Sequence, residues 1–190
     1  MTLVAPFAGQ YVPTGDLASG GGNTMKQARS VVIGTRLSVW LRAYWGIEGT
    51  VSYAPSRLLI SNGATYPGYV LAASAKALFR LGAPQARARF HVGGGLGLVR
   101  YGGDAYLWYG STSTGHGGSA TFFSGIANVG YTFQLTRSMA LRVDAEDYVF
   151  APHFDTCSRG VSGVCYVVWP GGATTSLQHQ LAWSVGVVFH

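Results

Sequence analysis

The residues that could carry out chemistry in this sequence are a few histidines, serines and carboxylates. An acyl hydrolase needs a Ser or Asp nucleophile, a histidine and an orienting carboxylate within reach of one another. Ser176, His179 and Asp147 would form such a group if the segments that contain them lay side by side. The alternative, which we favour, is that His179 is an interfacial histidine, at the boundary between an apolar and an aqueous environment, with no catalytic role.

The sequence gives no firm sign of a metal, cofactor or nucleotide site. His116, His153 and Asp155 would bind a metal only with a further ligand from elsewhere, and histidines in such polar segments are usually solvated. No CxxC, HExxH, phosphate-loop or dinucleotide motif occurs. The glycine run 93–97 lies in an alternating segment without a following helix, so it is not a nucleotide loop. We therefore predict that the chain is not an enzyme and has no cofactor or metal.

The two cysteines, Cys157 and Cys165, are eight positions apart in a segment that contains Gly and Ser. This spacing suits a small loop-closing disulfide, which would imply an oxidising compartment. Two free thiols are the alternative, and a zinc site would need two more ligands. No signal peptide is visible in this chain, because Met1 is not followed by a basic region and a long apolar run.

The composition limits the classes of protein to which the chain can belong. Of its 190 residues 28 are Gly, 48% are hydrophobic and only 11% are charged. Such an apolar chain is not disordered, yet no continuous apolar run reaches the ~20 residues of a spanning helix. The net charge is +6, but its 13 Lys and Arg residues are spaced singly. This spacing does not favour nucleic acid as a partner, and anionic lipid head groups fit a basic surface equally well.

Alternation with a period of two residues is the strongest pattern in the sequence. From Leu177 to Phe189 the odd positions are apolar except for His179, and the even positions are mostly polar or small. Two-faced segments of this kind predict β-strands. With this one, eight strands are predicted, and the others lie near 3–12, 35–39, 47–53, 73–80, 90–98, 127–133 and 139–149.

The links between these segments alternate in length. The short links lie near Leu41–Trp45, Leu81–Gln85 and Leu135–Ser138. The long links lie near Pro13–Gln27, Pro55–Pro67, Gly102–Gly118 and Pro152–Thr174. This layout is typical of a transmembrane β-barrel with short periplasmic turns and long extracellular loops. We predict an all-β, eight-stranded antiparallel up-and-down barrel that forms a single domain over residues 1–190.

A soluble barrel and a membrane barrel share this period of two residues. The apolar face points inward in a soluble barrel and outward, toward lipid, in a membrane barrel. The polar faces carry too few charges for the surface of a soluble protein, whereas a closed interior could hold them in pairs. We predict that the interior holds a charge network of three cations and three carboxylates, formed by Arg36, Lys76, Arg142, Glu48, Asp144 and Glu146. A soluble lipocalin-like barrel that binds a ligand remains the alternative.

Aromatic residues gather near both ends of the predicted strands, which is typical of the two aromatic girdles of a membrane barrel. At the short-turn end these are Trp40, Tyr44, Trp45, Phe79, Phe90, Phe133 and Phe189. At the long-loop end they are Tyr53, Tyr69, Tyr101, Tyr148 and Phe150.

Four segments together resemble the small eight-stranded outer membrane protein A-like barrels: Pro6–Asp16, Trp45–Tyr53, Leu141–Tyr148 and Leu181–Phe189. The resemblance covers essentially the whole chain and implies a bacterial outer-membrane location in contact with lipid and lipopolysaccharide. It also implies that the barrel assembly machinery recognises the C-terminal strand ending at Phe189. One departure is His190, which follows the aromatic residue on which this signal normally ends. The family's peptidoglycan-binding domain is absent from this sequence.

We predict a structural or surface-interaction protein whose polar interior is plugged and whose long loops carry the contacts. The loop residues expected to contact surface partners, lipopolysaccharide or further copies of the chain are Tyr106, Trp108, Tyr109, Phe154, Tyr166 and Trp169. A small pore and a lipid-modifying outer-membrane enzyme remain alternatives, because one fold hosts several functions.

Overall fold

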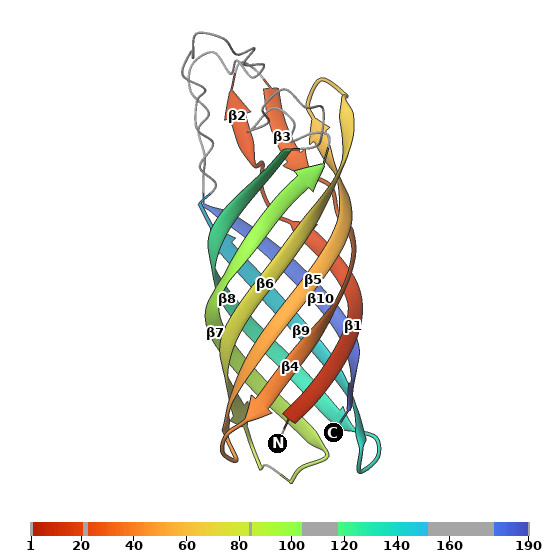
Figure 1. Cartoon of the computed structure of the whole chain (residues 1–190), viewed down its shortest axis with the longest axis vertical. Coiled ribbons are helices and arrows are strands. Elements are labelled where there is room, and N and C mark those ends of the chain that lie inside the picture. The colour runs from red at the N-terminus through yellow and green to blue at the C-terminus, as the bar shows by residue number, and fades with distance from the viewer. Residues whose placement is uncertain (1, 21–22, 84, 104–117, 152–176, 190) are drawn as a thin grey trace.

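Eight long β-strands form a closed antiparallel barrel in the computed structural model, which describes residues 2–20, 23–83, 85–103, 118–151 and 177–189 (Figure 1). The eight strands are β1 (Thr2–Pro13), β4 (Ser30–Trp40), β5 (Trp45–Ile60), β6 (Thr65–Leu81), β7 (Ala88–Gly103), β8 (Gly118–Gln134), β9 (Met139–Phe150) and β10 (Gln178–Phe189). The predicted all-β, eight-stranded barrel is therefore confirmed.

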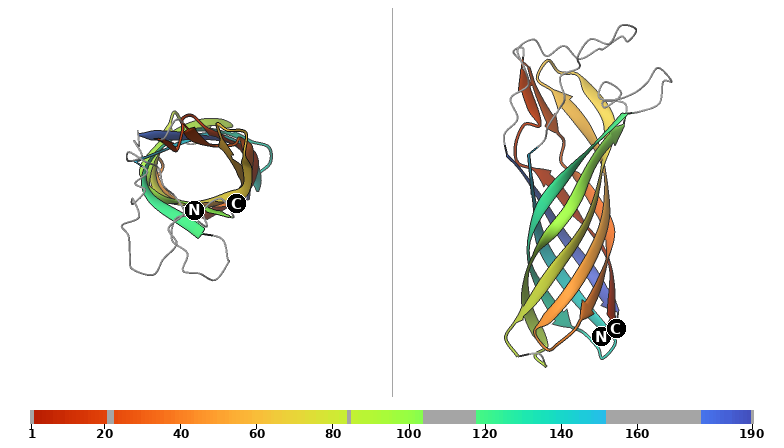
Figure 2. Two further views of the ribbon diagram at one scale, coloured as in Figure 1. Left: turned by 90° about the horizontal axis from the view of Figure 1, so that it is seen from above. Right: turned by 60° about the vertical axis from the view of Figure 1, so that its left-hand side comes forward.

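The barrel closes because each strand pairs with its neighbours on both sides. β1 pairs with β4 and with β10, which joins the two ends of the chain, and β5 pairs with β6. Viewed along its axis the barrel is a ring (Figure 2). Closure leaves no exposed sheet edge through the barrel wall, which is the condition for strands to lie in lipid.

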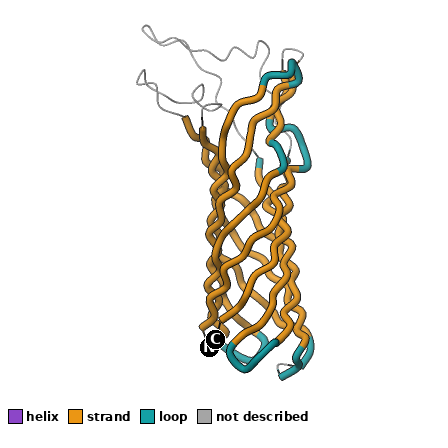
Figure 3. The backbone as a smooth tube through the Cα atoms, turned by 90° about the vertical axis from the view of Figure 1, so that its right-hand side faces the viewer, coloured by secondary structure: helices purple, strands orange, loops and turns teal. Residues whose placement is uncertain are grey.

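The three short turns lie at the same end of the barrel as both chain termini (Figure 3). In the first of them, the Leu41 amide donates to the carbonyl of Trp45 at 2.9 Å. The second needs Gly82, whose φ of +87° disfavours residues that have a Cβ. We call this end the turn end and the opposite end the loop end. The predicted short links are confirmed.

Two of the predicted long links contain strands. β2 (Ala18–Gly20) and β3 (Asn23–Gln27) form a small hairpin inside the first link. β3 extends the sheet at the loop end, where Met25 pairs with Ile60 and Gln27 with Leu58 of β5. The predicted long link over Pro13–Gln27 therefore consists partly of strands.

The predicted long link Pro55–Pro67 is also wrong, because β5 continues to Ile60 and β6 begins at Thr65. Both prolines lie in strands although proline cannot donate to a β-ladder. Pro55 lies beyond the last β4 pair of β5, at Tyr53, and before its first β3 pair, at Leu58. Pro67 lies beyond the last β7 pair of β6, at Gly68. Each proline therefore has an unpaired side on which its missing N–H is tolerated.

The apolar face of the strands points outward. Leu96, Val51 and Leu37 are 57%, 56% and 51% exposed, whereas the alternating polar residues are buried inside. A soluble lipocalin-like barrel would need the opposite arrangement. In the part of the chain that the structure describes, no helix is long and apolar enough to cross a membrane.

The aromatic girdles are only partly as predicted. At the turn end Tyr44, Trp45 and Phe90 are exposed. At the loop end the rings of Tyr53 and Tyr69 lie together on the outside, with centroids 6.0 Å apart. The other three predicted members of the loop-end girdle are buried inside the barrel, and at the turn end Trp40 packs against an inner cluster. These corrected residues are Trp40, Tyr101, Tyr148 and Phe150.

Candidate functional site: the barrel interior

Six charged side chains from four strands meet inside the barrel, and we call them the lumen charge cluster. Their relative exposure is between 1% and 4%, so water does not screen their interactions. The cluster consists of Arg36 on β4, Glu48 on β5, Lys76 on β6, and Arg142, Asp144 and Glu146 on β9. These are the six residues expected from the sequence to face the interior, and the structure brings all of them together.

Arg142 forms two-point hydrogen bonds with two carboxylates of the lumen charge cluster. Its Nη1 and Nη2 donate to the two carboxylate oxygens of Glu48 at 2.6 and 3.1 Å. Its Nε and Nη2 donate to the two oxygens of Asp144, both at 2.8 Å. Planar two-point contacts of this kind are the strongest ion pairs that a guanidinium makes.

The other two cations, Arg36 and Lys76, neutralise the remaining negative charge of the carboxylates. Arg36 lies 3.3 Å from Glu146 and 3.5 Å from Asp144, and its guanidinium stacks 3.8 Å from the centroid of the Phe7 ring. Lys76 Nζ pairs with Glu146 and lies 3.1 Å from Glu48. The three cations and three carboxylates cancel, so the buried cluster has no net formal charge. An uncompensated buried charge would be strongly unfavourable.

Polar side chains outside the six predicted residues also contact the carboxylates of the cluster. Ser38 donates to Glu48 at 2.5 Å and Tyr148 donates to Glu146 at 2.9 Å. His91 Nε2 lies 3.0 Å from Asp144. Gly130 faces His91 and Asp144 so closely that a Cβ there would collide with both. The signal that could have found these residues is their strand parity, which places them on the same face as the cluster.

Aromatic side chains fill the interior on the loop side of the lumen charge cluster. The ring centroids of Tyr101, Phe122 and Phe150 are 5.5 to 6.2 Å apart. The hydroxyls of Tyr11 and Tyr101 lie 3.3 Å apart. We call Tyr11, Tyr101, Phe122 and Phe150 the aromatic layer, and all four are at most 7% exposed. The predicted polar interior is therefore polar around the lumen charge cluster and aromatic on its loop side.

The structure brings together two of the three residues considered for acyl hydrolysis. His179 Nδ1 lies 2.8 Å from Asp147 Oδ2 on the outer face, with side chains 48% and 26% exposed. Ser176, the third, lies outside the described residues. Among those described, no hydroxyl donates to the His179 ring; the nearby Thr14 hydroxyl donates to the His179 main-chain oxygen at 2.5 Å.

Other predicted site residues also lie outside the described residues. They are Cys157, Cys165, His116, His153, Asp155 and the loop residues Tyr106, Trp108, Tyr109, Phe154, Tyr166 and Trp169. The structure therefore gives no support for the predicted disulfide, which stays a prediction. Within the described ranges, no group of three or more His, Cys, Asp or Glu could hold a metal ion.

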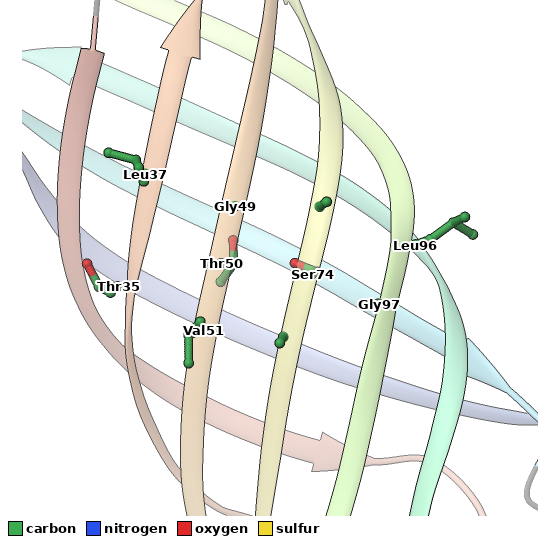
Figure 4. Close-up of a pocket in the computed structure, with 10 residues that line it drawn as sticks. Thr35, Leu37, Gly49, Thr50, Val51, Ser74, Leu96 and Gly97 are labelled. Atoms are coloured by element: carbon green, nitrogen blue, oxygen red, sulfur yellow. The ribbon is translucent and has the colours of Figure 1, made fainter.

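A shallow groove of about 450 Å³ crosses the outer face of β4 to β7 (Figure 4). It forms because small residues, among them Gly49, Ala73 and Ala75, lie between larger ones such as Leu37 and Leu96. The outward-facing lining is apolar, apart from the Thr35 hydroxyl. The groove therefore suits contact with hydrocarbon and has no groups for acid–base chemistry.

A scan against models of protein families gives no match, and a comparison with curated proteins finds no similar sequence. Solved structures are similar in fold. Neisserial surface protein A has a TM-score of 0.58 at 14% identity, and the match covers 99% of this chain and 95% of that chain. The outer membrane protein OprG from Pseudomonas aeruginosa has a TM-score of 0.62 at 8% identity, covering 98% of this chain and 94% of its own.

The attachment invasion locus protein of Yersinia pestis, in complex with the heparin analogue sucrose octasulfate, has a TM-score of 0.50 at 11% identity. That match covers 99% of this chain and 97% of the other. At such low identities the likeness concerns the fold. The chain has the fold of the small eight-stranded barrels of bacterial outer membranes, which is consistent with an outer-membrane location.

Proposed function

We propose that the chain is a non-enzymatic outer-membrane barrel with a plugged interior that serves a structural or surface-interaction role. The proposal rests on the direction in which the two faces of the strands point. Exposed aliphatic side chains cover the outside of the barrel, and the charged residues are paired inside. Hydrocarbon rather than water suits such an outer face. No described hydroxyl donates to the His179–Asp147 pair, so we assign it no catalysis.

The lipid environment follows from the strands themselves. A strand tilted in a bilayer needs about 9–11 residues to cross the hydrocarbon, and the shortest barrel strand has 11. We propose the orientation that is usual for outer-membrane barrels. The turn end then faces the periplasm, and the loop end faces the cell surface in contact with lipopolysaccharide. We further propose that the barrel assembly machinery recognises β10, whose last residue, Phe189, is 46% exposed.

The proposal that the interior is plugged rests on two successive obstructions, the lumen charge cluster and the aromatic layer. We expect the full chain to give no large, stable single-channel steps in a planar bilayer, because eight strands enclose a space that side chains can fill. Insertion is checked separately by the shift in gel mobility between boiled and unboiled samples. Stable steps from protein that is folded by this criterion would contradict a plugged interior and favour the small-pore alternative.

We assign the surface contacts to the long loops at the loop end. The test addresses one of them, the link between the end of β7 and the start of β8 (Figure 1). We expect replacement of residues 106–117 by a short Gly-Ser linker to weaken binding to lipopolysaccharide or self-association, since it removes Tyr106, Trp108 and Tyr109. Sedimentation in detergent measures self-association, and retention on immobilised lipopolysaccharide measures binding.

The matched control for this loop replacement is the substitution of Thr136 and Arg137 by glycine. Both residues lie in a turn at the opposite end of the barrel. The control should leave both measurements unchanged. If the shortened protein folds and keeps full binding and self-association, this loop has no part in either, and the proposed surface role of residues 106–117 is wrong.

A further inference from the structure

A small cavity lies inside the barrel at the turn end. Trp40, Arg80, Arg89, His91, Thr132 and Arg142 are among the residues that line it. Its volume is about 20 Å³, which is enough for a single water-sized atom group. Arg80 and Arg89 lie at its mouth, because β6 ends at Leu81 and β7 begins at Ala88.

Neutral groups hold both mouth arginines in place. The Arg80 guanidinium stacks 3.8 Å from the centroid of the Trp40 ring and donates to the carbonyl of Ala43 at 3.2 Å. Arg89 donates through Nη2 to the side-chain oxygen of Gln134. The buried Nε of Arg89 has no hydrogen-bond partner among the described residues. Each arginine is thus oriented while retaining its charge and free N–H donors.

No carboxylate from the described residues neutralises these two arginines. Asp144 and Glu48 lie deeper and bind Arg142. Asp147 is on the outer face, and the main chain of Asp16 accepts from Gln178 at the loop end. Two like charges in one recess repel each other, and an anion bound between them would offset this repulsion. In this respect the mouth differs from the lumen charge cluster, in which every charge has a partner.

The surrounding turns strengthen the positive potential. Arg42, Arg87 and Arg137 are exposed in the three turns at this end. Positive charges that converge on a low-dielectric recess raise the local concentration of anions. Guanidinium groups bind phosphate and carboxylate oxygens in a two-point geometry, and a phosphate is present in every phospholipid head group at this end of the barrel.

We propose that Arg80 and Arg89 form a binding site for a phosphate-type oxyanion at the turn end of the barrel interior. One oxygen of the anion enters the cavity, where the Thr132 hydroxyl and the Arg89 Nε line its path, and the remaining oxygens lie at the mouth. The group comes either from free phosphate or from the head group of an anionic phospholipid. The site is independent of the loop contacts proposed above.

The test uses the full chain in a maltoside detergent, which contains no phosphate. Binding of inorganic phosphate is followed by ³¹P nuclear magnetic resonance line width, and retained phosphatidylglycerol by native mass spectrometry. We expect Arg80→Gln and Arg89→Gln each to lower the affinity about tenfold, as for the loss of one charge-assisted donor. Arg137→Gln is the matched control, because it changes the net charge equally but lies in an exposed turn.

Gel mobility before and after boiling shows that each variant is folded. Phosphate binding that depends on Arg80 and Arg89 but not on Arg137 supports the site with free phosphate as the ligand. Retention of phosphatidylglycerol with the same dependence, without phosphate binding, supports the site with lipid as the source. If neither ligand binds, or if Arg137→Gln weakens binding as much as the other variants, the proposed site does not exist.

Discussion

Replacing Arg142 by leucine should destabilise the barrel by about 3–5 kcal/mol, the usual cost of removing one partner from a buried ion pair. The side chain makes two-point contacts with both Glu48 and Asp144. Without it, three buried carboxylates face only Arg36 and Lys76. Because the cluster is almost inaccessible to water, solvent cannot take over the lost hydrogen bonds.

The measurement is urea unfolding of the protein in lipid vesicles, followed by gel mobility and tryptophan fluorescence. Arg137→Leu removes the same charge from an exposed turn and should change the free energy of unfolding little. Adding Glu48→Gln to Arg142→Leu restores neutrality inside the barrel and should recover part of the lost stability. If Arg142→Leu were as stable as Arg137→Leu, the lumen charge cluster would not contribute to stability.

Placing arginine at Leu96 should destabilise the protein in a bilayer by about 2–4 kcal/mol, the cost of a cation near the membrane midplane of a barrel. Leu96 lies near the middle of β7, pairs with Ala75 and Gly125, and is 57% exposed on the outer face. Neither partner has a charged side chain that could compensate for the new cation.

Leu135→Arg is the control for this prediction, since Leu135 is similarly exposed, at 54%, but lies in a turn at the end of the barrel. Folding yield into vesicles and urea unfolding are measured for both variants. The membrane assignment predicts a large loss for Leu96→Arg and a small one for Leu135→Arg. Equal stability, together with better solubility without detergent, would instead favour the soluble barrel.

Strand parity explains why much of the fold could be predicted from the sequence. Alternation identifies which residues share a face, and the inward-facing carboxylates near the middle of the strands can be balanced by an equal number of cations at the same level. That reasoning reached Arg36, Glu48 and Arg142 without coordinates. His91 is not among the predicted residues, because a histidine counts as neutral in a balance of charges.

The other differences have separate physical causes. The abundance of aromatic residues at membrane interfaces predicts Tyr101 and Phe150 in the girdle, although their strand parity places them inside the barrel. The predicted long link begins at Pro55 and ends at Pro67, although proline is compatible with a strand that has an unpaired side. Which positions lack a partner depends on the unequal lengths of neighbouring strands, and a single sequence does not reveal those lengths.

The distribution of the lumen charge cluster along the chain has a consequence for the order of assembly. Arg36, Glu48 and Lys76 come from the first half of the chain and together have one excess positive charge, whereas β9 brings one excess negative charge. A half-built sheet that lacks β9 is therefore charged on its concave face and attracts water. The docking of β9 cancels that charge, so the lumen charge cluster is already neutral when β10 pairs with β1 and closes the wall.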